Sequence, residues 1–214
     1  MANPTGRRKV SMPILLAAGV SSLTLALGMT PSFAAFTASV NNSINNAGTG
    51  TLVMQESNSA GTVTCLSTDG GGISSNVATC STINKYGGNL SLMANGSSVT
   101  VANIRNLGTV DASQFVLTPG ACAQSAQAGG SGTATDLCSK ITITIASGSL
   151  TVFSGSAASF GAGGPIDVLA KLGLAKLTAG SQAGFTVTAK IDASVGNTYQ
   201  GLQISQPMTW AFAS

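Results

Sequence analysis

The stretch 185-FTVTAKI-191 alternates between apolar and polar residues along its whole length. A period of two places one set of side chains in a core and the other in water, which is typical of a half-buried β strand. The same alternation occurs in 141-ITITI-145 and through most of residues 202–212. These three segments predict a protein built mainly from β strands.

Shorter apolar runs extend this pattern, at residues 52–54, 62–66, 90–93, 99–104, 115–117 and 150–153. Turn-forming pairs such as Asp69-Gly70, Asn95-Gly96 and Pro119-Gly120 lie between them. Short strands separated by turns are typical of antiparallel sandwiches. We therefore expect an all-β fold, a jelly-roll antiparallel sandwich.

One segment, 165-PIDVLAKLG-173, departs from the strand pattern. Pro165 suits the first position of a helix, Asp167 suits the positive end of the helix dipole, and Gly173 offers a stop. The sequence predicts one short helix over about 165–173.

Residues 1–34 have the layout of a secretory signal peptide, with three basic residues at 7–9, an apolar run over 12–29 and a small-x-small site at 32–34. A retained membrane helix is the alternative. We expect cleavage after Ala34, secretion to the extracellular space or the cell surface, and no membrane segment once the signal is removed.

The basic balance of the chain belongs to this signal. The sequence has nine Lys plus Arg and six Asp plus Glu, and without the three basic residues at 7–9 it is formally neutral. The remaining cations are scattered singly, so we expect no nucleic-acid partner. Low net charge also removes the self-repulsion that keeps proteins apart, which permits assembly.

All four cysteines follow the signal, where disulfides are chemically permitted. Three pairings are possible. We favour Cys65 with Cys80 and Cys122 with Cys138, because each pair brackets a short glycine-rich segment. Zinc is the alternative, but the chain has no Cys-x-x-Cys and no histidine.

The absence of histidine also excludes Ser-His-Asp and Cys-His catalysis. Among the acids, Glu56 and Asp192 lie next to strand ends and are the candidates for an acid-only hydrolase. Turn and surface roles are the simpler interpretation. We expect no enzyme activity, no metal site and no cofactor.

The segment after the signal is a further strand candidate with an apolar face, formed by Phe36, Ala38, Val40 and Ile44. A flexible Asn- and Gly-rich stretch, 45-NNAGTGT-51, follows it. We expect residues 35–46 to form a strand and linker, and residues 47–214 to form the sandwich domain. Such a terminal strand can fill a place in its own sheet, as an ordinary edge strand of a monomer, or it can add to the exposed sheet edge of a neighbour.

Three segments resemble the TasA and camelysin family of secreted bacterial proteins, which includes fibre subunits of biofilm matrix. They are 45-NNAGTGTLVMQESN-58, 99-VTVANIRNLGTVDASQFVLT-118, and a C-terminal region with the signature Asn197-Thr198-Tyr199-Gln200-Gly201. The resemblance covers nearly the whole chain after the signal, and the Asn-x-Tyr-Gln-Gly signature is its most specific part.

The resemblance implies a jelly roll in which the N-terminal segment of one subunit completes the sheet of the next. It gives the donor role to residues 35–44, with the four apolar residues Phe36, Ala38, Val40 and Ile44 entering the neighbour, and a structural role to Asn197, Tyr199, Gln200 and Gly201. The cysteine-bearing insertions depart from the best-known fibre members. The peptidase label of the family has no support here, because HExxH is absent.

We therefore expect a secreted structural subunit that polymerises head to tail with itself by donor-strand complementation. An accessory anchoring or assembly protein is a further candidate partner. The alternatives are a monomeric surface adhesin or glycan-binding sandwich and, less favoured, a camelysin-type peptidase.

Overall fold

A computed structural model of the chain describes residues 46–89 and 92–214. The chain divides into two units, Met1–Ala47 and Gly48–Ser214, and the second contains every described helix and strand. The predicted signal and donor residues Phe36, Ala38, Val40 and Ile44 lie outside the described residues.

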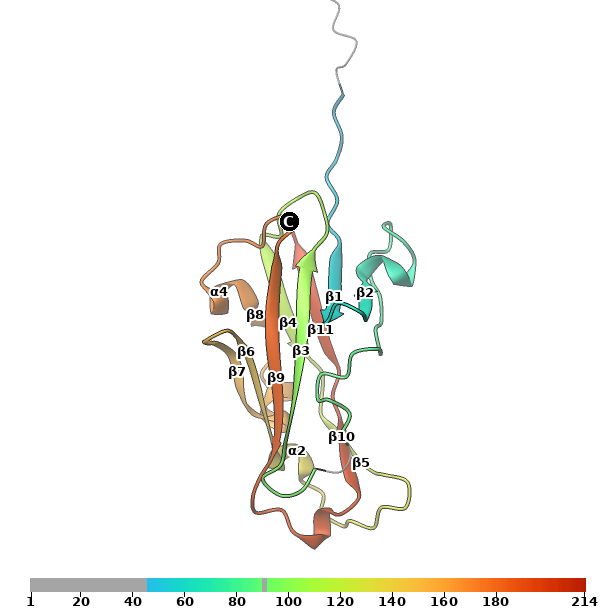
Figure 1. The fold of residues 1–214 in the computed structure, drawn as a ribbon, viewed down its shortest axis with the longest axis vertical. Coiled ribbons are helices and arrows are strands. Elements are labelled where there is room, and N and C mark those ends of the chain that lie inside the picture. The colour runs from blue at the N-terminus through green and yellow to red at the C-terminus, as the bar shows by residue number, and fades with distance from the viewer. Residues whose placement is uncertain (1–45, 90–91) are drawn as a thin grey trace, which may run out of the picture. The chain divides into compact units, whose positions relative to one another are not determined.

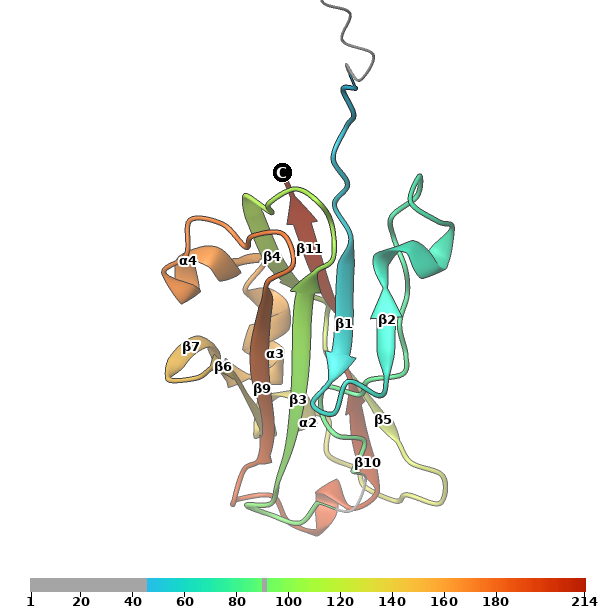
Figure 2. The same cartoon turned by 45° about the horizontal axis from the view of Figure 1, so that its top comes forward.

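The larger layer of the second unit is a six-stranded antiparallel sheet in the order β2-β1-β3-β9-β6-β7 (Figures 1 and 2). Its strands, in chain order, are β1 (Met54–Asn58), β2 (Thr64–Leu66), β3 (Ser97–Asn106), β6 (Ile141–Ser147), β7 (Leu150–Ser156) and β9 (Gln182–Ile191). The two longest strands, β3 and β9, pair from Ser97 with Lys190 to Arg105 with Gln182 and form the centre of the layer.

The second layer is built from two sets of antiparallel strands, and consecutive strands of the chain connect one set with the other. In the first, β11 (Met208–Ala213) pairs with β4 (Gln114–Pro119), which also pairs with β8 (Ile166–Asp167). In the second, β10 (Leu202–Ser205) pairs with β5 (Ala123–Ala126). The N–H of Gly120 donates to the carbonyl of Pro207 at 2.8 Å, which joins the two sets.

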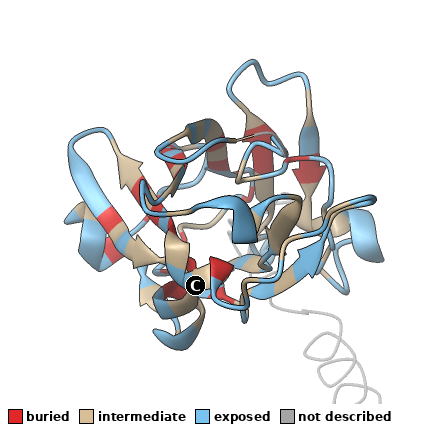
Figure 3. Ribbon diagram, turned by 90° about the horizontal axis from the view of Figure 1, so that it is seen from below, coloured by how far each residue is buried: buried red, intermediate tan, exposed pale blue. Residues whose placement is uncertain are grey.

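The core lies between these layers and follows the alternation seen in the sequence. Along β9, Phe185, Val187 and Ala189 are buried, whereas Thr186 and Lys190 are exposed. Buried stretches lie mainly on the strands and helices, and the connecting loops are largely exposed (Figure 3). The prediction of an all-β antiparallel sandwich is confirmed, and the jelly-roll connection order stays a prediction.

Aromatic rings fill the centre of this core. Phe115 of β4 is fully buried, and its ring centroid lies 5.9 Å from that of Phe185, 5.6 Å from Trp210 and 4.8 Å from Phe212. Edge-on and tilted contacts of this kind stabilise aromatic pairs beyond the area that they bury.

The predicted helix is present as α4 (Val168–Leu172), but it begins three residues after Pro165. Asp167 is its N-cap, and its side chain accepts a hydrogen bond from the Ala170 N–H at 3.0 Å. Gly173 ends it with φ of 67°. Pro165 is therefore outside the helix, because Ile166 and Asp167 pair with β4 first.

Several short elements differ from the prediction. Two further helices, α2 (Leu137–Lys140) and α3 (Ala157–Ala162), and the strands β5 and β8 were not expected. The predicted strand over 90–93 is wrong for its described part, because Leu92 and Met93 lie in no strand.

The disulfide pairing favoured from the sequence is confirmed: Cys65 bonds Cys80 and Cys122 bonds Cys138, each with Cα atoms 6.1 Å apart. Two disulfides fit a protein of an oxidising environment. No helix in the described part of the chain is long and apolar enough to cross a membrane.

Candidate functional site: a groove along the free edge of β11

The strand β11 has one unpaired edge. Within residues 46–89 and 92–214 it pairs only with β4. Gly120 and Pro207 form a hydrogen-bonded pair at the start of this ladder. In an antiparallel ladder, every second residue bonds the partner strand and the residues between them point their backbone groups to the other side. The backbone N–H and C=O groups of Met208, Trp210 and Phe212 therefore point away from β4. These groups are placed to bond one more strand.

A groove of about 1120 Å³ lies along this edge, between β1 in one layer and β10 and β11 in the other. The larger sheet continues past β3 to β1 and β2, whereas the second layer ends at β11. The half-buried apolar side chains of the groove come from both layers: Leu52, Met54, Ile191, Leu202, Ile204, Met208, Trp210 and Phe212. The groove therefore exposes the part of the core that a further strand would cover.

Trp210 connects the groove with the aromatic core. Its ring centroid lies 4.8 Å from that of Phe185, and its indole N–H is buried without a hydrogen-bond acceptor among the described residues. A buried donor without an acceptor is unfavourable by about 1–3 kcal/mol. An acceptor supplied by an incoming chain would remove this cost.

Residues 81–89 form the wall of the groove beside β10, its lower wall in Figure 1. Two side-chain contacts hold them against the strands. Lys85 Nζ lies 2.5 Å from Glu56 Oε1 of β1, and the two side chains are only 11% and 10% exposed. The hydroxyl of Tyr86 donates to Gln206 Oε1 at 2.6 Å, between β10 and β11. Burial raises the pKa of Tyr86 above its ordinary value, so this phenol stays a donor.

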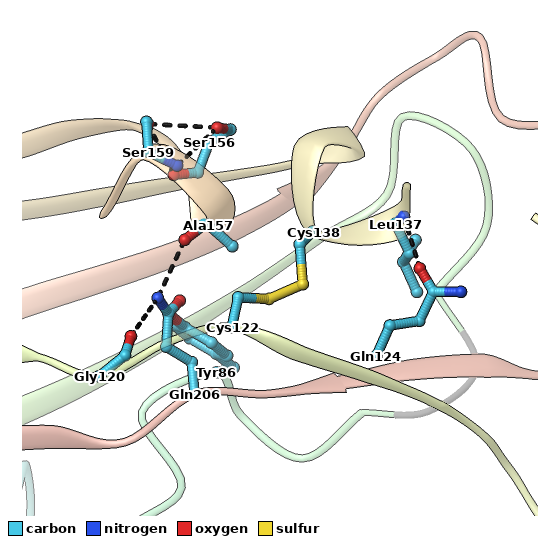
Figure 4. Close-up of a disulfide and its surroundings, with 10 residues drawn as sticks. All are labelled: Tyr86, Gly120, Cys122, Gln124, Leu137, Cys138, Ser156, Ala157, Ser159 and Gln206. Carbon is cyan, nitrogen blue, oxygen red and sulfur yellow. Dashed lines mark hydrogen bonds between the residues drawn. A yellow bond between two sulfur atoms is a disulfide. The ribbon is translucent and has the colours of Figure 1, made fainter. Parts of the chain in front are cut away.

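Gln206 holds the centre of this wall. Its Nε2 donates to the carbonyls of Gly120 and Ala157, both at 2.9 Å, while its Oε1 accepts from Tyr86 (Figure 4). The side chain thus ties residues 81–89 to Gly120, just after β4, and to α3. The disulfide between Cys122 and Cys138 lies beside this network (Figure 4).

The two acids singled out for a hydrolase have separate partners. Glu56 is buried in its ion pair with Lys85. Asp192 is exposed after β9, and Oδ1 accepts from the Ser194 N–H at 2.7 Å. The hydrogen bonds from Ser194 hold the pKa of Asp192 below its ordinary value. Among the described residues, no three His, Cys, Asp or Glu side chains are grouped to hold a metal ion.

The Asn197–Gly201 signature forms a turn that leads into β10. Asn197–Tyr199 is a 3-10 turn, and the hydroxyl of Tyr199 donates to Asp136 Oδ1 at 2.7 Å. The carbonyl of Gly201 accepts from the Gln127 N–H at 2.7 Å. The signature therefore fastens the loop closed by Cys122 and Cys138 to the start of β10.

Gly201 allows the closest approach in this turn. Its φ is 68°, in the left-handed region, and a Cβ atom there would overlap Gly130. We expect Gly201→Ala to lower the free energy of unfolding by more than the roughly 1–2 kcal/mol of the left-handed conformation alone, measured by urea denaturation. Gly148→Ala is the matched control, since Gly148 has φ of 57° and open space around it. Equal losses in both variants would show that the contact with Gly130 has no energetic weight.

No family model matches the chain, and no curated protein matches it. What the structure defines is a class: an antiparallel β sandwich with two local disulfides and an unpaired strand edge beside an apolar groove. The resemblance to TasA and camelysin proteins stays a prediction from the three sequence segments.

Proposed function

We propose that the protein is a secreted structural subunit that forms extracellular or biofilm-matrix fibres by donor-strand complementation. Residues 35–44 of one copy enter the groove of the next copy and pair with the free edge of β11. The observation that carries this proposal is the free β11 edge beside an apolar groove.

The chemistry of the donor segment matches that of the groove. Phe36, Ala38 and Val40 alternate with polar residues, so an extended chain can point all three into the apolar side of the groove. Its backbone can bond the outward N–H and C=O groups of β11. Burial of an aromatic and a branched side chain contributes about 1.5–3 kcal/mol each.

The arrangement favours a polymer over a closed dimer. Each subunit would give a strand from its N-terminal segment and receive a strand in its groove, which makes the contact head to tail. Such contacts continue into filaments unless the rotation between subunits closes a ring. The formally neutral chain after residue 34 opposes this association only weakly.

Electron microscopy of residues 35–214 tests the proposal directly. We expect fibres from this chain after incubation at neutral pH, and folded monomers from a chain that begins at residue 45. The shorter chain retains the groove but has no strand to give, so adding it to the intact chain should shorten the fibres by capping them. Folded monomers from both chains, even with seeds added, would overturn the proposal.

A pair of aspartate substitutions provides a matched control. In Val40→Asp the charge would enter the apolar groove, whereas in Asn41→Asp it would face away from the groove. Because burying an unpaired charge is strongly unfavourable, we expect fibres from Asn41→Asp only. Equal assembly of the two variants would show that the expected face of the strand is wrong.

A further inference from the structure

We propose that residues 81–89 are a latch that closes the lower part of the groove in the free subunit and is displaced when a strand from a second copy enters. This inference rests on the proposed function and adds a step that controls when a strand can enter the groove. The latch follows Cys80 along the chain and crosses beside β10 in Figures 1 and 2.

The latch is held at both layers by a small number of side chains. Lys85 reaches Glu56 of β1, and Tyr86 reaches Gln206 between β10 and β11. Ile83 is buried, and Tyr86 packs against the core. These contacts occupy the gap between the two layers where the groove continues from β11 toward β10.

The donor segment is longer than β11, so it can extend along the groove as far as the latch. β11 has six residues, which extend about 20 Å, whereas ten residues of extended chain cover about 33 Å. Pairing that continues past Met208 reaches Gln206, where the Tyr86 hydroxyl is bound. We infer that residues 35–44 pair past Met208, along the side of the groove that leads toward β10, and that this register displaces the latch.

The latch can move without unfolding the strands. Residues 81–89 contain turns but no described strand or helix, and Gly87 and Gly88 have φ of 79° and 66°. Cys80 is anchored to β2 through Cys65, and Ser97 begins β3. The disulfide fixes the start of the latch, and its opening breaks the ion pair, the Tyr86 hydrogen bond and the packing of Ile83 and Tyr86, among other contacts.

Chemical acylation of lysines reports the position of the latch. Lys85 is 11% exposed in its ion pair, whereas Lys171 is exposed. In residues 35–214 kept dilute, we expect an amine-reactive ester to label Lys85 much more slowly than Lys171, as measured by mass spectrometry of peptides. In fibres, Lys85 should react at a rate similar to that of Lys171.

The two tyrosines of the chain offer a matched pair of variants. Tyr86→Phe removes the hydrogen bond to Gln206, and Tyr199→Phe removes a similar bond to Asp136 outside the latch. Because Tyr86→Phe loses one hydrogen bond, a larger fraction of monomers should have an open latch. We expect the labelling rate of Lys85 in this monomer to rise about fivefold. Tyr199→Phe should leave this rate unchanged.

The outcomes separate the latch from the fibre. Fibres in which Lys85 stays protected would overturn the latch and leave the proposed function intact. If no fibres form, the monomer is mixed with an excess of a synthetic peptide of residues 35–44. Faster labelling of Lys85 in this mixture supports displacement of the latch. An unchanged rate with the peptide overturns the latch, as does an unchanged rate in Tyr86→Phe.

Discussion

A variant with all four cysteines replaced by alanine is expected to lose about 6 kcal/mol of unfolding free energy. The two disulfides close loops with sequence separations of 15 and 16 residues, and each such loop contributes about 3 kcal/mol by restricting the unfolded chain. A typical domain has only about 5–15 kcal/mol in total. We therefore expect urea denaturation to show a variant that is partly or wholly unfolded at room temperature.

The two paired variants give the control for this expectation. Cys65→Ala with Cys80→Ala releases the loop before the latch, and Cys122→Ala with Cys138→Ala releases the loop that is fastened to the Asn197–Gly201 turn. Their losses should be similar and nearly additive, because the loops are of almost equal length. Losses below about 1 kcal/mol would show that residual structure already restricts these loops in the unfolded chain.

Phe115→Ala is expected to lower the free energy of unfolding by about 3–5 kcal/mol. The ring is fully buried and contacts Phe185, Trp210 and Phe212, so its removal leaves a cavity in the core between the two layers. Thermal denaturation should show a fall in Tm of roughly 10 °C for a domain of this size.

Val99→Ala tests whether this loss comes from the core. Val99 lies on β3 and is 60% exposed, and exposed substitutions usually change stability by less than about 0.5 kcal/mol. Phe115→Leu should lie between the two, because leucine fills part of the cavity. A loss in Phe115→Ala no larger than that in Val99→Ala would contradict the aromatic core described above.

The long strands could be predicted because their signal is local. In β6 and β9 the alternation runs over five to seven residues and matches the burial of each side chain. The helices α2 and α3 have only four and six residues, too few for a helical period to appear. The run over 90–93 looked like a strand, but its described part contributes to the wall of the groove instead.

The disulfides were also predictable, since both loops are short and rich in glycine. The groove was not, because it depends on which strands end each layer, and strand order is set by pairing between distant segments. The bond between Tyr86 and Gln206 joins residues 120 positions apart. A single sequence contains no local pattern for such a contact.

The position of β11 along the chain also sets an order of events during synthesis. Residues 208–213 follow every other described strand, and β9, which supplies the facing Phe185, is itself complete only at Ile191. In the proposed fibre, the giving strand therefore leaves the ribosome first and the receiving edge last. A nascent chain can therefore receive a strand only after residues 208–213 have been made, whereas its own residues 35–44 can be given to a completed copy much earlier.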